Sequence, residues 1–390
     1  MRNRKANFRL MELLSRKFND LFDSEGEVQT YFCPGRVNLI GEHIDYLGGL
    51  VMPAAISLGI KALVRKNDLR KIRLYSTDFP NLQEIDLSNP PQTKQGKWTD
   101  FVLGILLEFE SEANASGLDI LFDSTLPKAS GLSSSAALEV LCYYIFSKQW
   151  KNEEPDRVKM AVICQRVENN FIGVQCGIMD QFAVSNGKKN HAIQLNCNSL
   201  DFNYAPINLG AYSLVIINSN KSRALAESAY NQRLEECEEA LSIIQKNRSI
   251  DQLVSANTND LNLLENAVLK RRVKHAFTEQ VRVLESAKAL EMQDLVRFGQ
   301  LLNASHESLQ SDFEVSCSEL DFIVKNLQES EYCLGARMTG AGFGGCCIAL
   351  IESQKVRDIM NSLSESYREK FGLQINWYNC QIANGVKTLA

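Results

Sequence analysis

The chain has 390 residues, of which 45% are hydrophobic and 23% are charged, the ordinary balance of a globular protein. Its net charge of −5 provides no positive field that would attract nucleic acid or an anionic membrane surface. The length suggests two or three domains, and no stretch reaches the roughly 18 apolar residues that a membrane span requires.

The 11 cysteines are scattered, odd in number and mostly placed inside apolar runs. A CxxC pair is absent and there are only four histidines, so the sequence gives little support to a zinc site. Residues 1–20 are locally basic but lack the apolar core of a signal peptide. These features predict reduced thiols in a reducing compartment, and we expect the protein to be cytoplasmic.

The first half of the chain mixes helical and strand patterns. Apolar residues from Leu10 to Phe22 recur at helical spacing and predict an amphipathic first helix. Strands are expected at 27–32, 59–64, 72–75, 118–126 and 191–195. Helices are expected at 98–109, 133–148, 156–170 and 178–184.

A largely apolar strand at 212–217 starts the second half, which is richer in helices. Long charged helices are expected at 224–246, 262–290 and 292–305. The chain closes with a candidate pair of strands, 345–351 and 373–378, around one more helix. The pattern predicts an α+β fold with a boundary near residue 205, which gives two domains, 1–205 and 206–390.

The segment LPKASGLSSSAA, residues 126–137, lies where an expected strand ends and an expected helix begins. The first N–H groups of a helix are unpaired and carry partial positive charge, so small residues there let a phosphate approach. The three serines, 133–135, add hydroxyls for phosphate oxygens or for Mg²⁺. A serine cap after a glycine turn is the ordinary alternative. Neither a GxxxxGK[ST] loop nor an HRD and DFG pair is present, which excludes Walker-type and protein-kinase sites.

The segment GRVNLIGEHIDY, residues 35–46, crowds hydrogen-bonding groups together. Its acceptors, Glu42, His43 and Asp45, can bind several neighbouring hydroxyls at once, as a sugar presents them. Two alternatives remain open: a metal site, which would need ligands from elsewhere, and a solvated charged loop. Arg36 has no obvious local carboxylate partner and is free to meet an external anion.

A third segment, GARMTGAGFGGCC at residues 335–347, places five glycines in eleven positions just before an apolar strand. Such a loop makes tight turns with positive φ or lets a ligand approach the backbone, although glycine-rich turns before strands are also common.

Taken together, in this order and spacing, the three segments resemble the galactokinases of the GHMP kinase superfamily. GRVNLIGEHIDY is similar to the galactokinase signature, LPKASGLSSSAA to the superfamily's phosphate loop and MTGAGFGGCC to its third motif. Further similarity lies at 177–182, 228–233 and 305–321, so the resemblance covers nearly the whole chain. It implies a two-domain GHMP kinase fold with the active site in the cleft between the domains.

The resemblance also implies roles for individual residues. Asp180 would be the catalytic carboxylate facing the anomeric hydroxyl, and Arg36 would keep it ionised and stabilise charge on the transferred phosphoryl group. The sugar would be bound by Glu42, His43, Ile44, Asp45, Gly177 and Tyr230. The nucleotide would be bound by Ser76, Trp98, Ala129, Ser130, Gly131, Leu132, Ser133, Ser134 and Ser135. Mg²⁺ would be held by Ser135 and Glu168.

The function implied is transfer of the γ-phosphate of ATP, with Mg²⁺, to the anomeric hydroxyl of galactose. Ile44 and Leu47 depart from the usual signature beside the sugar loop, so an N-acetylgalactosamine kinase is the alternative. A non-catalytic sugar sensor is a second alternative, which the intact run 133–137 disfavours. The expected partners are small molecules, without nucleic acid or membrane, and a monomer is expected.

Overall fold

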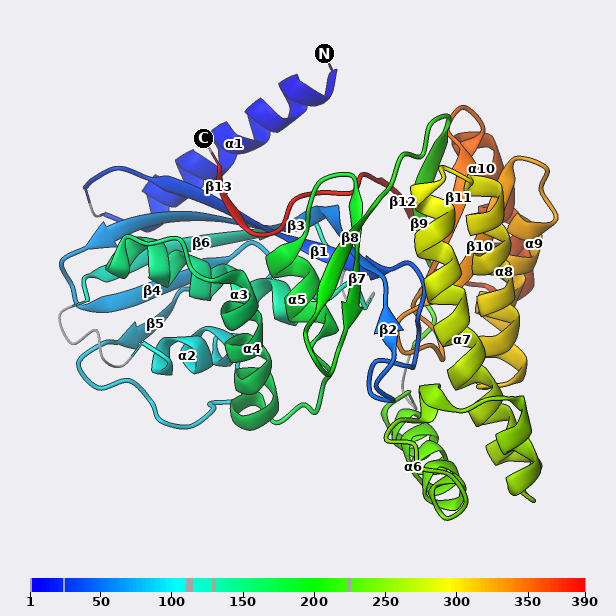
Figure 1. Ribbon diagram of the computed structural model, residues 1–390. Coiled ribbons are helices and arrows are strands. Elements are labelled where there is room, and N and C mark those ends of the chain that lie inside the picture. The colour runs from blue at the N-terminus through cyan, green and yellow to red at the C-terminus, as the bar shows by residue number, and fades with distance from the viewer. Residues whose placement is uncertain (1, 24, 110–114, 128–130, 223–225, 390) are drawn as a thin grey trace.

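The computed structural model describes residues 2–23, 25–109, 115–127, 131–222 and 226–389. It has the mixed helix and sheet content that the sequence predicts, arranged as two lobes (Figure 1). The strands form a six-stranded, a four-stranded and a three-stranded sheet. Among the described helices, none is long and apolar enough to cross a bilayer.

The six-stranded sheet builds the first lobe, with the strand order β13-β1-β3-β6-β4-β5. Only the β4–β6 pair is parallel; the other pairs are antiparallel. The strands are β1 (Gln29–Asn38), β3 (Pro53–Asn67), β4 (Lys71–Ser76), β5 (Gln83–Asp86), β6 (Gly117–Ser124) and β13 (Lys387–Leu389).

Strand β1 runs six residues beyond its expected end at Phe32, into the segment predicted to be a polar loop. Its pairing with β3 is irregular between Pro34 and Arg36, because proline has no N–H to donate to the ladder. Pairing resumes at Arg36 and continues to Asn38, which lies opposite Pro53. Two polar side chains are thereby carried on a buried strand, where the surrounding sheet fixes their positions.

Helices cover both faces of this sheet (Figure 1). On one face lies α1 (Arg2–Leu21), whose Phe18 packs with Leu63 and Leu121 of the sheet and confirms the expected amphipathic helix. The other face carries α2 (Asp100–Leu107), α3 (Ser134–Phe146), α4 (Arg157–Val167) and α5 (Met179–Asn186). Helices α3 and α4 each continue into a π-helical turn, Ser147–Lys151 and Glu168–Ile172.

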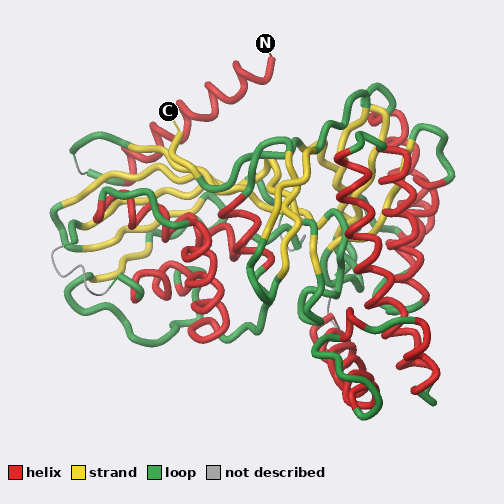
Figure 2. Tube along the Cα trace, in the orientation of Figure 1, coloured by secondary structure: helices red, strands yellow, loops and turns green. Residues whose placement is uncertain are grey.

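The second lobe has a four-stranded sheet in the order β10-β11-β9-β12, with helices beside it (Figure 2). Its strands are β9 (Tyr212–Asn218), β10 (Cys333–Thr339), β11 (Cys346–Glu352) and β12 (Asn376–Cys380). Its helices are α6 (Ala226–Gln245), α7 (Ala267–Glu291), α8 (Leu295–Ser311), α9 (Ser318–Gln328) and α10 (Val356–Phe371), with 3₁₀ turns at Leu253–Ser255 and Thr258–Leu263.

The expected pairing of 345–351 with 373–378 is wrong. Both of these strands pair with β9, one on each side, because β9, whose residues 214–217 are apolar and buried, takes an interior position in the sheet. The glycine-rich segment is also expected to be a loop up to the strand predicted from residue 345. Its first part, up to Thr339, is strand β10, which leaves only residues 340–345 as the loop.

The chain crosses between the lobes twice. It leaves the first lobe after the three-stranded sheet of β2 (Leu50–Val51), β7 (His191–Asn196) and β8 (Phe202–Pro206), and enters β9 through residues 207–211. It returns after β12, and β13 then pairs with β1, so the C-terminal strand belongs to the sheet of the first lobe (Figure 1).

Candidate functional site

The predicted site residues gather around two neighbouring cavities near the start of α3. A polar cavity of about 220 Å³ is lined by residues of both lobes: Arg36, Asn38, Gly41, Glu42, His43, Asp45, Gln175, Cys176, Gly177, Met179, Asp180, Tyr230, Gly340 and Ala341. An apolar cavity of about 360 Å³ is lined by residues of the first lobe: Ile60, Ser76, Asp78, Phe79, Trp98, Phe101, Phe122, Ser124, Leu126, Pro127, Ser134, Ser135 and Leu138.

Arg36 and Asp180, 144 residues apart in the chain, form a two-pronged ion pair in the polar cavity. Arg36 Nε donates to Asp180 Oδ1 at 2.8 Å and Nη2 donates to Oδ2 at 2.7 Å. The remaining Arg36 nitrogen, Nη1, donates to the Gly131 carbonyl at 2.6 Å. Arg36 is buried, whereas the Asp180 side chain is 29% exposed, so its carboxylate is accessible from the cavity.

Ser133 is the second partner of Asp180. Its hydroxyl donates to Asp180 Oδ2 at 2.6 Å. Ser133 precedes α3 with φ of 63°, a left-handed conformation that is uncommon outside glycine and that clusters at functional sites. The phosphate loop and the predicted catalytic carboxylate are therefore joined directly, and Ser133 serves the carboxylate rather than only a phosphate.

Glu42 ties the sugar loop to the second lobe. Its side chain is 3% exposed, and its Oε1 accepts from the Gly340 N–H at 2.8 Å. Its Oε2 accepts from Asn38 Nδ2 at 2.8 Å and forms an ion pair with Arg337 Nη2 at 2.9 Å. Sequence reasoning missed Asn38 and Arg337; the available signal was a lone arginine among small and apolar residues just before the glycine-rich loop.

His43 has protein partners at both ring nitrogens. Burial lowers the pKa of His43 to about 3, so the ring is neutral. Its Nε2 lies 3.2 Å from the Ala341 carbonyl and must carry the proton, which leaves Nδ1 to accept from the Tyr46 hydroxyl at 2.9 Å. The ring also packs against that of Tyr230, with centroids 5.7 Å apart. His43 therefore shapes the cavity wall.

Asp45 is a second carboxyl group in the polar cavity. Burial, reinforced by the nearby Glu42, raises the pKa of Asp45 to about 7. A Cβ at Gly177 would lie 2.8 Å from Asp45 Oδ2, so a larger residue there would displace this carboxyl group. Burial also raises the pKa of Tyr230, which keeps its hydroxyl protonated as a donor. Ile44 differs from these residues because it is fully buried in the hydrophobic core behind the loop.

The apolar cavity is built around Trp98. The Trp98 ring stacks on Phe79 with centroids 6.0 Å apart and planes 14° apart, and meets Phe122 edge-on. Ser76, Ser134 and Ser135 also line this cavity. An aromatic cavity that also has serine residues in its lining suits a planar base with a phosphate chain.

Other phosphate-loop predictions have a different outcome. Ala129 and Ser130 lie outside the described residues. Gly131 and Leu132 both turn their carbonyls to Arg36, which donates to them through Nη1 and the backbone N–H.

Ser135 and Glu168, the predicted metal ligands, lie side by side. Ser135 donates a hydrogen bond to the Glu168 carboxylate. Burial of the Glu168 side chain raises the pKa of this group. Gln181, missed by sequence reasoning, also donates to Glu168 Oε2. Two oxygen ligands suit Mg²⁺, which typically takes one or two protein oxygens and completes its shell with phosphates and water.

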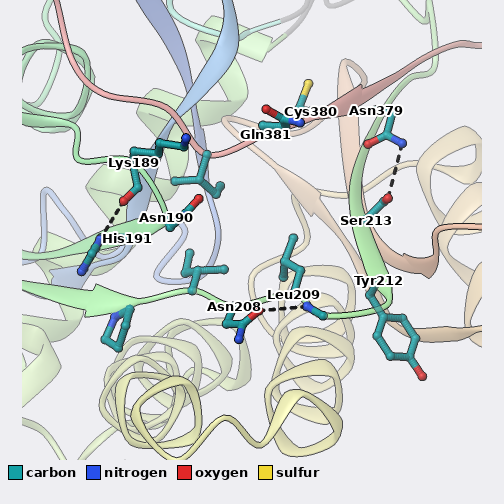
Figure 3. Close-up of a pocket in the computed structure, with 14 residues that line it drawn as sticks. Lys189, Asn190, His191, Asn208, Leu209, Tyr212, Ser213, Asn379, Cys380 and Gln381 are labelled. Carbon is teal, nitrogen blue, oxygen red and sulfur yellow. Dashed lines mark hydrogen bonds between the residues drawn. The ribbon is translucent and has the colours of Figure 1, made fainter. Parts of the chain in front are cut away.

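A third, larger cavity of about 830 Å³ lies elsewhere, between the two crossings that link the lobes (Figure 3). Lys189, Asn208, Ser213 and Gln381 are among the residues around it. It contains none of the predicted site residues, and no aspartate or glutamate lines it, so it offers no carboxylate to a reacting hydroxyl.

The proteins that this chain resembles agree with the site described above. Residues 16–66 match the galactokinase galactose-binding signature, 100–188 the N-terminal domain of GHMP kinases and 286–369 their C-terminal region. Galactokinases of Enterococcus faecalis and Staphylococcus carnosus are 44% and 41% identical, over 97% of this chain and 99% of theirs.

Solved structures give the same result. Lactococcus lactis galactokinase in complex with galactose superimposes with a TM-score of 0.90 at 38% identity, over 97% of this chain and all of the other. Methanococcus jannaschii mevalonate kinase, at 21% identity and a TM-score of 0.67 over 93% of this chain and all of the other, shares the fold. By sequence, fold and site geometry, this chain belongs to the galactokinase family of the GHMP kinases.

Proposed function

We propose that this protein is an ATP-dependent kinase that phosphorylates the anomeric hydroxyl of galactose, giving galactose 1-phosphate and ADP. The observation that carries the proposal is the Arg36–Asp180–Ser133 cluster: Arg36 and Asp180 line the polar cavity, and Ser133 directly precedes Ser134 and Ser135 of the apolar cavity. The family membership supports it, since galactokinases are the relatives that match nearly the whole chain.

The chemistry assigned to the cluster is simple. The sugar hydroxyl oxygen forms a bond to the γ-phosphorus, the bond from that phosphorus to the bridging oxygen breaks, and the hydroxyl proton passes to Asp180 or is oriented by it. Arg36 keeps Asp180 in place and lies beside the developing negative charge. Ser133 holds the same carboxylate from the phosphate loop. Most of the rate then comes from positioning.

Magnesium would be held by Ser135 and Glu168 and would neutralise charge on the phosphates. Asp45 and the Tyr230 hydroxyl would bind the remaining sugar hydroxyls, one as acceptor and one as donor. Trp98 and Ser76 would line the nucleoside pocket.

Galactose is favoured over N-acetylgalactosamine because Ile44 and Leu47, the two departures from the usual galactokinase signature, do not line the polar cavity and so do not alter its contacts with the sugar. Ile44 is fully buried and Leu47 is 8% exposed, both within the hydrophobic core. Their identities therefore act on the sugar only through the loop that they support.

The domain division near residue 205 remains part of the proposal, with the strand β13 added to the first domain by its pairing with β1. A cytoplasmic monomer is proposed as well. All 11 cysteines are unpaired, as expected in a reducing compartment.

The test is direct: incubate the purified protein with MgATP and each of galactose, N-acetylgalactosamine, glucose and arabinose, and measure ADP and sugar phosphate. We expect product with galactose far above the others. Product mainly with N-acetylgalactosamine would overturn the substrate, and sugar binding without product would indicate a sensor.

A further inference from the structure

Two buried polar side chains lie beneath the phosphate and metal residues and take no direct part in the mechanism above. Glu139 of α3 and Gln181 of α5 are both completely buried. The Gln181 side-chain nitrogen donates to Glu168 Oε2 at 2.5 Å and lies within hydrogen-bond reach of Glu139 Oε2 at 3.4 Å. One amide thus joins two carboxyl groups from different helices.

This arrangement destabilises the fold, which indicates that the two side chains have a functional role. Glu139 Oε1 and Gln181 Oε1 are buried and, among the described residues, have no hydrogen-bond partner. A buried polar atom without a partner destabilises a fold, and an apolar side chain of similar size would pack there without that cost. Burial, with the nearby Glu168, raises the pKa of Glu139 to about 9, so the group is a neutral acid at pH 7.

The placement explains what the pair can do. Glu139 lies one helical turn after Ser135, so both side chains project from the same side of α3. Gln181 directly follows Asp180 at the start of α5. Its two amide hydrogens point at Glu139 and Glu168, which fixes the orientation of the amide group. The Glu168 carboxylate is thereby held by hydrogen bonds from both Gln181 and Ser135.

We propose that Glu139 is a positioning residue for the magnesium–nucleotide site: it orients the Gln181 side chain, and Gln181 fixes the Glu168 carboxylate beside Ser135. This inference rests on the proposed function, because it takes Glu168 as the carboxylate that meets the metal. Substitution of a residue that orients a metal ligand commonly weakens metal affinity about 10- to 100-fold.

The experiment measures metal binding without turnover. Mn²⁺ is titrated into the protein in the presence of ADP, and the free ion is followed by electron paramagnetic resonance. Glu139→Leu and Gln181→Met are expected to weaken Mn²⁺ binding about 10-fold, while Glu139→Gln, which keeps a polar partner for the amide, stays within about 3-fold of wild type. Galactose affinity, measured by calorimetry, is expected to stay unchanged in all three variants.

In turnover assays Glu139→Leu and Gln181→Met should require about 10-fold more Mg²⁺ for half-maximal velocity, with kcat recovered at saturating Mg²⁺. Lys189→Ala, at the cavity between the lobe crossings, is a matched distant control and should behave as wild type.

Glu168→Gln separates the two proposals. If it leaves Mn²⁺ binding intact, the metal role of Glu168 in the proposed function fails. If it weakens binding while Glu139→Leu and Gln181→Met bind Mn²⁺ as wild type does, the positioning role is overturned. Should Glu139→Leu fail to fold, Gln181→Met decides alone, since it removes the same amide bridge with a side chain of similar size.

Discussion

Arg337 of β10 and Glu42 of the sugar loop form an ion pair across the two lobes, with Nη2 and Oε2 2.9 Å apart and exposures of 0% and 3%. The same arginine donates from Nη1 to the Leu39 carbonyl at 2.9 Å. From α7, Glu279 accepts from the Gly41 N–H at 2.9 Å. The second lobe therefore holds the sugar loop of the first lobe in shape, and the polar cavity exists only when the lobes are joined.

The first prediction concerns this pair. Arg337→Met should lower the free energy of unfolding by about 3–5 kcal/mol, because the buried Glu42 charge would lose its partner. Urea denaturation followed by circular dichroism measures the effect. Lys71→Met is the control, since Lys71 pairs with Glu84 on the surface and should leave the midpoint nearly unchanged. An unchanged midpoint in the Arg337 variant would contradict the structural role of the pair.

The second prediction concerns Asp180. Asp180→Asn keeps the size of the side chain and removes its charge, so turnover should fall by a factor of about 10² to 10⁴ or below detection. ATP binding should be largely kept, because the apolar cavity contains no part of Asp180. Steady-state ADP release and calorimetric titration with ATP measure the two quantities. Wild-type turnover in this variant would remove Asp180 from the mechanism.

The third prediction follows from Asp45, whose pKa is raised to about 7 from a usual value of 3.8. At pH 6 most of the free protein holds a proton on this group. A sugar hydroxyl that donates to Asp45 favours the ionised form, so galactose binding should release a fraction of a proton near pH 6 and none above about pH 8.5. Calorimetry in buffers of different ionisation enthalpy measures the released proton.

The same group links stability to pH. Because the folded protein binds this proton more tightly than the unfolded chain, the contribution of Asp45 to stability is present at low pH and is lost as the pH rises from about 4 to about 7. Asp45→Asn should remove both this slope and the proton release. Proton release that persists in Asp45→Asn would assign it to another group.

These contacts show why the sequence predicts some parts of the site and misses others. The phosphate loop and sugar loop are local patterns, so their residue types indicate anion and hydroxyl binding before any fold is known. Arg36 looked unpaired because its partner, Asp180, is 144 residues away. Arg337 and Gln181 were missed for the same reason: each acts on a carboxylate from a distant segment.

The fold shows the same limit. Long helices such as α7 and α8 follow from periodicity, and the apolar run of β9 predicts a strand. Strand neighbours depend on how the sheet is assembled, and periodicity carries no information on that. The pairing of β12 with β9, and of β13 with β1, had no local signal.

The last prediction concerns Trp98. If the apolar cavity takes the nucleoside, removing the indole from its stack on Phe79 should raise the KM for ATP, by an amount equivalent to about 1–3 kcal/mol for a stacked base, and leave the KM for galactose unchanged. ADP should also change the tryptophan fluorescence of the wild-type protein, and Trp98→Ala should abolish that change. Trp150→Phe is the matched control, because Trp150 stacks on Phe146 and donates to the Ser116 carbonyl away from the cavity. A nucleotide response that survives in Trp98→Ala and is lost in Trp150→Phe would place the base elsewhere.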